Sequence, residues 1–237
     1  MGAIVAPFLF WAGISYLRKE HSMLIASYNP SEMGDILVTI TAPDNGAQVS
    51  KVNKDVAQIT TAKDQQLLGY NFMNASQLLP ELKGQNGQVF LSDEAVAKLN
   101  EQIHAAGFDA ELTADHDPKF VVGYVEELKD HPKSDHLKVT KTQIGADQTV
   151  QIVCGSPNVK AGIKVVVARP GAMMPDGKII WPGALMGVES DGMLCGFREL
   201  RMKNAPDKKG LWIIPDDWQE VGEAVDFAKA DTFFPAK

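Results

Sequence analysis

The chain has 237 residues, of which 45% are apolar, and a formal net charge of −7. This length fits one large or two ordinary domains, with enough apolar residues for a core in each. An evenly spread charge of −7 would argue against a polyanion as partner, but residues 1–117 carry 7 basic and 14 acidic side chains, against 16 and 16 in residues 118–237. A nucleic-acid site in the second half is therefore compatible with the charge.

Residues 1–22 are an apolar leader. The run from Gly2 to Leu17 is nearly all apolar and is followed by Arg18-Lys19. It is shorter than the about 20 apolar residues that a membrane span needs, and it lacks the basic start and small-residue cleavage pattern of a secretory signal. We expect the fold to begin at Met23, with residues 1–22 as upstream sequence outside it. A short membrane anchor is the alternative.

Residues 23–112 mix strand and helix patterns and predict a small acidic α+β domain. The run from Ile36 to Ala42 is β-branched and leads into Pro-Asp-Asn-Gly, where a tight turn is expected. The clearest helix begins at Ser92, whose hydroxyl can cap the first turn, and ends at Gly107. The segment 108–112 is expected to return to a strand. No catalytic or metal motif is present in this part, so a packing or partner-docking role is expected.

Residues 113–118 (Thr-Ala-Asp-His-Asp-Pro) are polar, contain proline, and predict a linker. Beyond it, residues 119–230 contain short apolar runs that are rich in Val and Ile and bounded by Gly, Pro, Asn or Asp. This pattern predicts an all-β OB-fold, a five-stranded Greek-key barrel with binding loops on one side. Residues 231–237 are expected to be a tail. The expected strands are 120–129, 137–144, 149–154 and 163–168, with closing pieces at 178–181 and 192–194 and a further apolar run at 211–215.

Cysteine and histidine usage gives no sign of a metal or a cofactor. Cys154 and Cys195 lie inside apolar runs and are expected to be reduced core residues of a cytoplasmic protein. His131 and His136 flank a loop, but no thiolate or carboxylate follows at a metal-ligand spacing, so no metal site is predicted. Because no nucleophile, base or cofactor motif can be assembled, no enzymatic activity is expected.

Four ordered segments of the second half carry a family resemblance. They are V-V-G-Y-V-E-E-L-K-D-H-P-K-S-D-H-L-K-V, Q-I-V-C-G-S-P-N-V-K-A-G, V-V-V-A-R-P-G-A and G-V-E-S-D-G-M-L-C. Together they resemble the tRNA-binding domain of the bacterial phenylalanyl-tRNA synthetase beta chain, which also occurs in methionyl-tRNA synthetase C-terminal appendices and in endothelial monocyte-activating polypeptide. The resemblance covers residues 120–226. The total length and the acidic front domain resemble the free-standing bacterial tRNA-binding proteins of the YtpR type.

The resemblance implies tRNA binding by an OB-fold through phosphate contacts and shape recognition, without chemistry on the RNA. Lysines straddle the first loop of the barrel, where ammonium groups can follow a phosphate backbone, although a solvated hairpin is the structural alternative. Asn158 is expected either to brace its own loop or to read a base, and Met193 either to face RNA or to fill the core. The candidate RNA-binding residues are Lys129, His131, Lys133, Lys138, Asn158, Lys160, Ser190, Met193, Arg198, Arg201 and Lys203.

The expected partners follow from the same resemblance. They are tRNA, an aminoacyl-tRNA synthetase or another translation protein, and a second copy of the chain in a homodimer, with no membrane partner. The segment 197–210 departs from the synthetase pattern, where a more acidic run stands, and this leaves partner details there open. The alternative function is a protein-interaction module, in which the barrel keeps its fold but docks a protein such as a synthetase or an RNA-modifying enzyme.

Overall fold

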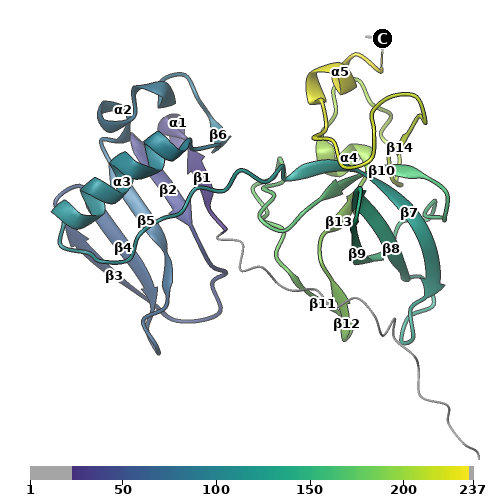
Figure 1. Ribbon diagram of the computed structural model, residues 1–237, viewed down its shortest axis with the longest axis horizontal. Coiled ribbons are helices and arrows are strands. Elements are labelled where there is room, and N and C mark those ends of the chain that lie inside the picture. Colours follow the sequence, from purple (N-terminus) through teal and green to yellow (C-terminus); the bar gives the residue numbers. More distant parts are fainter. Residues whose placement is uncertain (1–22, 235–237) are drawn as a thin grey trace, which may run out of the picture.

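The computed structural model describes residues 23–234, which form two lobes joined by an extended segment (Figure 1). The predicted leader, residues 1–22, lies outside the described residues, as do the last three residues of the predicted tail. Within the described range no helix is both long enough and apolar enough to cross a membrane.

The first lobe is a six-stranded antiparallel sheet with helices packed on one face (Figure 1). Its strand order is β3-β4-β5-β2-β1-β6, so the first strand lies inside the sheet, and the hairpin β3–β4 forms one edge. The elements are β1 (Ile25–Tyr28), α1 (Pro30–Met33), β2 (Ile36–Ile40), β3 (Gln48–Asn53), β4 (Val56–Thr61), β5 (Leu67–Met73), α2 (Ala75–Leu78), the 3₁₀ helix η1 (Pro80–Leu82), β6 (Gly87–Val89) and α3 (Asp93–Ala105).

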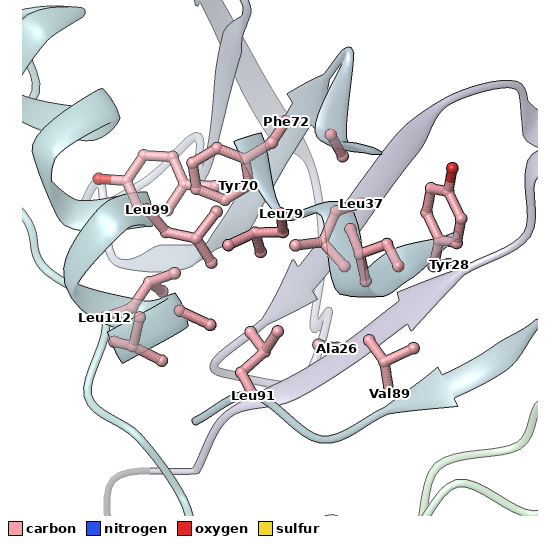
Figure 2. Packing of buried hydrophobic residues seen from close by; sticks show 14 of the residues in the cluster. Ala26, Tyr28, Leu37, Tyr70, Phe72, Leu79, Val89, Leu91, Leu99 and Leu112 are labelled. Atoms are coloured by element: carbon pink, nitrogen blue, oxygen red, sulfur yellow. The ribbon is translucent and has the colours of Figure 1, made fainter. Parts of the chain in front are cut away.

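Helix α3 forms where the sequence predicts it. The Ser92 hydroxyl accepts a hydrogen bond from the Ala95 N–H at 3.2 Å and caps the first turn. Val96, Leu99 and Ile103 recur at helical spacing and are buried against the sheet. In Figure 2 the side chain of Leu99 points toward those of the sheet and of the segment after it. This packing buries one face of the sheet and gives the lobe its own core.

The segment 108–112 is not a strand, contrary to the sequence expectation. The Asn100 side chain forms hydrogen bonds with both backbone groups of Leu112. It donates to the Leu112 carbonyl at 2.9 Å and accepts from the Leu112 N–H at 2.8 Å. The Tyr70 hydroxyl donates to the Ala110 carbonyl at 2.6 Å. Side chains of the lobe therefore satisfy the backbone groups that a neighbouring strand would have bound.

The second lobe is a curled antiparallel sheet in the order β13-β10-β7-β8-β9, with β14 paired to β10. A mixed first lobe followed by this curled all-β lobe confirms the predicted fold class. The elements are β7 (Phe120–Asp130), β8 (Lys138–Gly145), β9 (Gln148–Cys154), β10 (Lys164–Ala168), β11 (Gly183–Leu185), β12 (Val188–Ser190), β13 (Met193–Cys195), α4 (Phe197–Leu200), β14 (Ile213–Ile214) and α5 (Phe227–Asp231).

The long strand β7 curls because of two local features. A Cβ on Gly123 would lie 2.4 Å from a methyl carbon of Val167, so only glycine lets β7 approach β10 this closely. The register against β8 shifts between Val125 and Glu127, which marks a bulge. The strand can therefore pair with β10 along its first half and with β8 along its second. This curl encloses the buried apolar side chains of β7, β8, β9 and β10.

The C-terminal segments cover one end of the curled sheet (Figure 1). Trp212 is 1% exposed, and its ring packs against those of Phe197 and Trp218, with ring centroids 6.4 and 5.2 Å apart. The sequence expectation that Trp212 is buried is confirmed. Trp212 is thus used in packing, whereas Phe227 and Phe233 of this lobe are 37% and 43% exposed.

Candidate nucleic-acid interface

The loop between β7 and β8 is held by a buried histidine. His131 is 4% exposed. Its Nδ1 accepts a hydrogen bond from the Lys133 backbone N–H at 3.1 Å, so the ring proton resides on Nε2, which donates to the Leu185 carbonyl at 3.1 Å. The neutral ring uses both nitrogens inside the protein. The structure therefore places His131 as a link between the β7–β8 loop and the β11–β12 hairpin.

The β11–β12 hairpin rests on the outer side of β9. Ser190 Oγ accepts from the Val153 N–H at 3.1 Å and donates to the Gly192 carbonyl at 3.3 Å. The Gln151 amide donates to the Glu189 carbonyl at 2.8 Å. Val188 is buried in a small cluster with Leu137, Val139 and Val153. The base of the hairpin is thus fixed, and Ser190 serves as one of its attachments.

The lysines of this loop differ in their surroundings. Lys138 forms an ion pair with Asp130, and Lys129 is exposed at the end of β7. The Lys133 ammonium has no carboxylate partner among residues 23–234, and it lies 3.3 Å from the position that a Cβ on Gly187 would occupy. Lys133 is therefore an available cation where the loop meets the hairpin.

The loop between β9 and β10 holds a second pair of predicted residues. Asn158 Oδ1 accepts from the Leu211 N–H at 2.7 Å and from the Ser156 hydroxyl at 2.9 Å, and its Nδ2 donates to the Leu211 carbonyl at 3.1 Å. These contacts agree with the bracing interpretation of Asn158. Lys160 is exposed, and its ammonium pairs with no carboxylate in the described part of the chain.

The remaining predicted residues lie on β13 and around α4. Met193 is half-buried against the cluster that contains Trp212. Arg198 forms a 2.6 Å ion pair with Asp207, and Lys203 is exposed. Arg201 is exposed, has a φ of +47°, and forms no ion pair within the described residues. Gly192, directly before β13, lies close to the backbone at the end of β10. This position requires glycine, because a Cβ would lie 2.8 Å from the Ala168 carbonyl oxygen.

The predicted residues do not form one continuous patch. In Figure 1 the helix α4 lies near the upper end of the curled sheet, whereas the turn of the β11–β12 hairpin lies at its lower end. His131, Lys133 and Ser190 belong to the lower group, and Arg198, Arg201 and Lys203 to the upper one. A single small ligand cannot reach both groups, but a folded RNA is large enough to do so.

Sequence reasoning missed two exposed residues of the lower group. Leu185 and Met186, at the turn of the β11–β12 hairpin, are 45% and 51% exposed. The only signal in the sequence is two large apolar residues directly before Gly187, at a point where a turn is expected to be polar.

Three titratable groups elsewhere in the described part of the lobe have raised pKa values. A hydrogen bond with the Glu126 carboxylate raises the pKa of Lys141, and the Lys141 Nζ and Glu126 Oε2 atoms lie 2.9 Å apart. Burial raises the pKa of both cysteine thiols. Within residues 23–234 no group of three His, Cys, Asp or Glu side chains could hold a metal ion.

Comparison with known proteins matches one family model to part of each lobe. Residues 43–115 match a "Domain of unknown function (DUF4479)" and residues 120–224 a "Putative tRNA binding domain". The phenylalanine–tRNA ligase beta subunit of Oceanobacillus iheyensis is 38% identical over 66% of this chain, but the match spans only 18% of that subunit. The C-terminal domain of Plasmodium vivax p43 aligns with 44% of this chain and 56% of its own, at 27% identity and a TM-score of 0.33, too low to bear on the fold.

A full-length relative is found in Bacillus subtilis. The "Putative tRNA-binding protein YtpR" of that organism is 40% identical over 203 residues, which are 85% of this chain and 99% of the relative. The similarity thus extends over both lobes and leaves almost none of the relative unmatched. The chain belongs to the YtpR family of bacterial proteins.

Proposed function

We propose that this protein binds tRNA through its second lobe, by contacts to phosphates and to the shape of the folded RNA, without catalysing a reaction on it. The observation that carries the proposal is the 40% identity with the B. subtilis protein over 99% of its length, together with the match of residues 120–224 to the tRNA-binding domain family. Such binding requires no cofactor.

The charges of the described residues support phosphate contact at a few positions. Lys133, Lys160 and Arg201 are exposed and free of carboxylate partners within residues 23–234. Lys138 and Arg198 would have to leave their aspartates first, which costs part of the gain. A cation that neutralises a phosphate releases a counterion, so each such contact makes the affinity more dependent on salt. We assign the main phosphate contacts to Lys133, Lys160 and Arg201.

Filter binding with bulk tRNA between 50 and 300 mM salt tests the proposal. We expect wild-type affinity to fall steeply with salt. Changing Lys133, Lys160 or Arg201 singly to Gln should weaken binding at low salt and reduce the slope of log K against log[salt] by about 0.7 to 0.9 for each phosphate that is no longer neutralised. The three positions lie on different loops, so the single variants also show which end of the lobe the RNA touches.

The matched control is a pair of exposed lysines on the first lobe, Lys51 and Lys63, which have no ion pair among the described residues. Changing both to Gln alters the net charge by more than any single variant does, yet it should leave the salt slope unchanged. Wild-type protein that fails to retain tRNA at 50 mM salt would contradict the proposed function. Equal slopes for all variants would contradict the assignment of the contacts.

Within this proposal the protein acts in the cytoplasm. The partner classes to test are an aminoacyl-tRNA synthetase, another translation protein, and a second copy of the chain. Sedimentation of the purified protein with and without tRNA separates a homodimer from a monomer. If a synthetase associates with the protein only when tRNA is present, the association is mediated by the RNA. If it associates in the absence of tRNA, the protein-interaction module is favoured.

A further inference from the structure

The turn of the β11–β12 hairpin contains an apolar residue at a position that folding alone does not favour. Leu185 pairs with Val188, so Met186 and Gly187 form a two-residue hairpin loop, and both have positive φ, +49° and +85°. Loops of this kind favour Asn-Gly or Asp-Gly, because Gly and the short polar residues Asn and Asp tolerate positive φ. Residues with larger side chains are strained there. Met186 is strained there and also 51% exposed, so it gains little from packing. Strain kept at an exposed position indicates a role outside the fold.

From these observations we propose that Leu185 and Met186 form an apolar wedge that packs against the face of an exposed base of the bound RNA. The inference rests on the proposed function and adds to it an interaction that no phosphate-binding lysine supplies. Leu and Met are among the apolar side chains that minor-groove DNA-binding proteins insert as wedges between base steps. The Lys133 ammonium, beside Gly187, is positioned to reach the phosphate of the same nucleotide.

The hairpin is built to hold this wedge in place. The Leu185 carbonyl accepts from the buried His131, Ser190 binds Val153, and Val188 is buried against β8 and β9. The base of the hairpin is therefore fixed on the curled sheet while its turn projects from the lower end (Figure 1). Because the hairpin is rigid where it joins the curled sheet, little conformational entropy is lost when its turn touches a ligand.

The size and charge of the surface favour a base over a protein partner. Two side chains cover about the area of one base, whereas a stable protein interface needs roughly 800 Å² on each side. Leu185 and Met186 carry no charge, so a contact between them and a base releases no counterion. The contribution of the wedge should therefore not depend on salt, unlike that of the phosphate contacts.

The change Met186→Asn tests the wedge without threatening the fold, because Asn-Gly is the pair that this turn favours. We expect Tm to stay the same or to rise, while affinity for bulk tRNA falls about tenfold, which is the scale of removing the stacking partner of one base. The salt slope should stay that of the wild type. Leu185→Thr, which suits an exposed strand, should weaken binding in the same way.

The matched control is Val52→Thr, which removes another exposed apolar side chain, on the edge strand β3 of the first lobe, and should leave binding unchanged. If the wild type retains tRNA and Met186→Asn retains it equally well, the wedge is wrong and the proposed function stands. If the wild type retains none, both fail. A shift of the Met186→Asn variant from dimer to monomer in sedimentation, with unchanged RNA affinity per chain, would instead assign the turn to an interface between copies and overturn the wedge.

Discussion

At the scale of single residues, burial governs the chemistry of the two thiols. Cys195 is 0% exposed, and burial raises its pKa to about 12; the pKa of Cys154 is raised for the same reason. The ordinary value is 9.0. As the pH rises above 9, the unfolded chain therefore releases these protons before the folded chain does. Stability is unaffected by the thiols below pH 9 and falls between pH 9 and 12.

We expect the difference in Tm between wild type and Cys195→Ala to reveal this effect. At pH 7.5 the variant should be less stable, because a buried sulfur atom is removed. At pH 10.5 the gap should narrow, because the variant has no thiol to ionise at this position. Thermal unfolding at the two pH values measures the gap, and a gap that is constant or widens would show that the Cys195 thiol ionises as easily in the folded protein as in the unfolded one. Comparing the two proteins removes the contribution of the tyrosines, which titrate in the same range.

At the scale of elements, one histidine joins two segments that lie 54 residues apart in the chain. His131→Ala leaves the Lys133 N–H and the Leu185 carbonyl without their partner, and the loss of each of these partly buried hydrogen bonds costs about 1 kcal/mol. We expect faster amide hydrogen exchange in residues 183–190 and weaker tRNA binding, because the wedge is no longer held. His136→Ala is the control, since that side chain is 72% exposed on the same loop. Unchanged exchange in the hairpin would mean that its interactions with β9 suffice.

The same elements show what could be predicted from the sequence. The strands of the curled sheet were predictable because Val and Ile recur between Gly, Pro and Asn, and helix α3 because its cap and its apolar spacing agree. The β11–β12 hairpin was not, because it is short and five of the six residues in its strands are outside the apolar clusters. Segment 108–112 was misjudged because side chains far along the chain, Tyr70 among them, bind its backbone.

The candidate site shows a sharper limit. Residue type predicted that Lys133 and Lys160 are exposed cations, but nothing in the sequence reveals that Asp130 pairs with Lys138 or that Asp207 pairs with Arg198. The sequence leaves open whether Asn158 braces its loop or reads a base, and only the structure reveals that its side chain binds the backbone of Leu211. The direction in which a polar side chain points depends on interactions with distant segments, which no local pattern encodes.

At the scale of the whole molecule, the segment that connects the two lobes contains a buried ion pair. The Asp115 carboxylate and the Lys119 ammonium lie 2.6 Å apart, and their side chains are only 6% and 7% exposed. Asp115 also accepts from the Leu24 N–H at 3.4 Å, at the start of the first lobe, and the Arg169 N–H in the second lobe donates to the Lys119 carbonyl at 2.8 Å. The segment between the lobes is therefore attached to both of them.

The lobes also meet across a cleft of about 370 Å³. Val38, Ile40 and Ile59, on the face of the first sheet opposite to α3, line one side of it, and Ile179 and Trp181 of the second lobe line the other. The cleft is open, so these apolar walls contribute less than a packed interface would. The arrangement of the lobes therefore depends on the connecting segment and its contacts with both lobes.

We expect Lys119→Met to destabilise this junction by about 3 to 5 kcal/mol, because it leaves the Asp115 carboxylate buried without its cation. In calorimetry, one unfolding transition should separate into two as the lobes uncouple, and small-angle X-ray scattering should report a wider range of distances between them. The double change Asp115→Asn with Lys119→Met should recover part of the stability, since no buried charge remains. As a control, Glu94→Gln breaks the exposed pair with Lys98 on α3 and should change neither measurement. Should Lys119→Met unfold like the wild type, the cleft and the backbone hydrogen bonds would be sufficient to hold the lobes together.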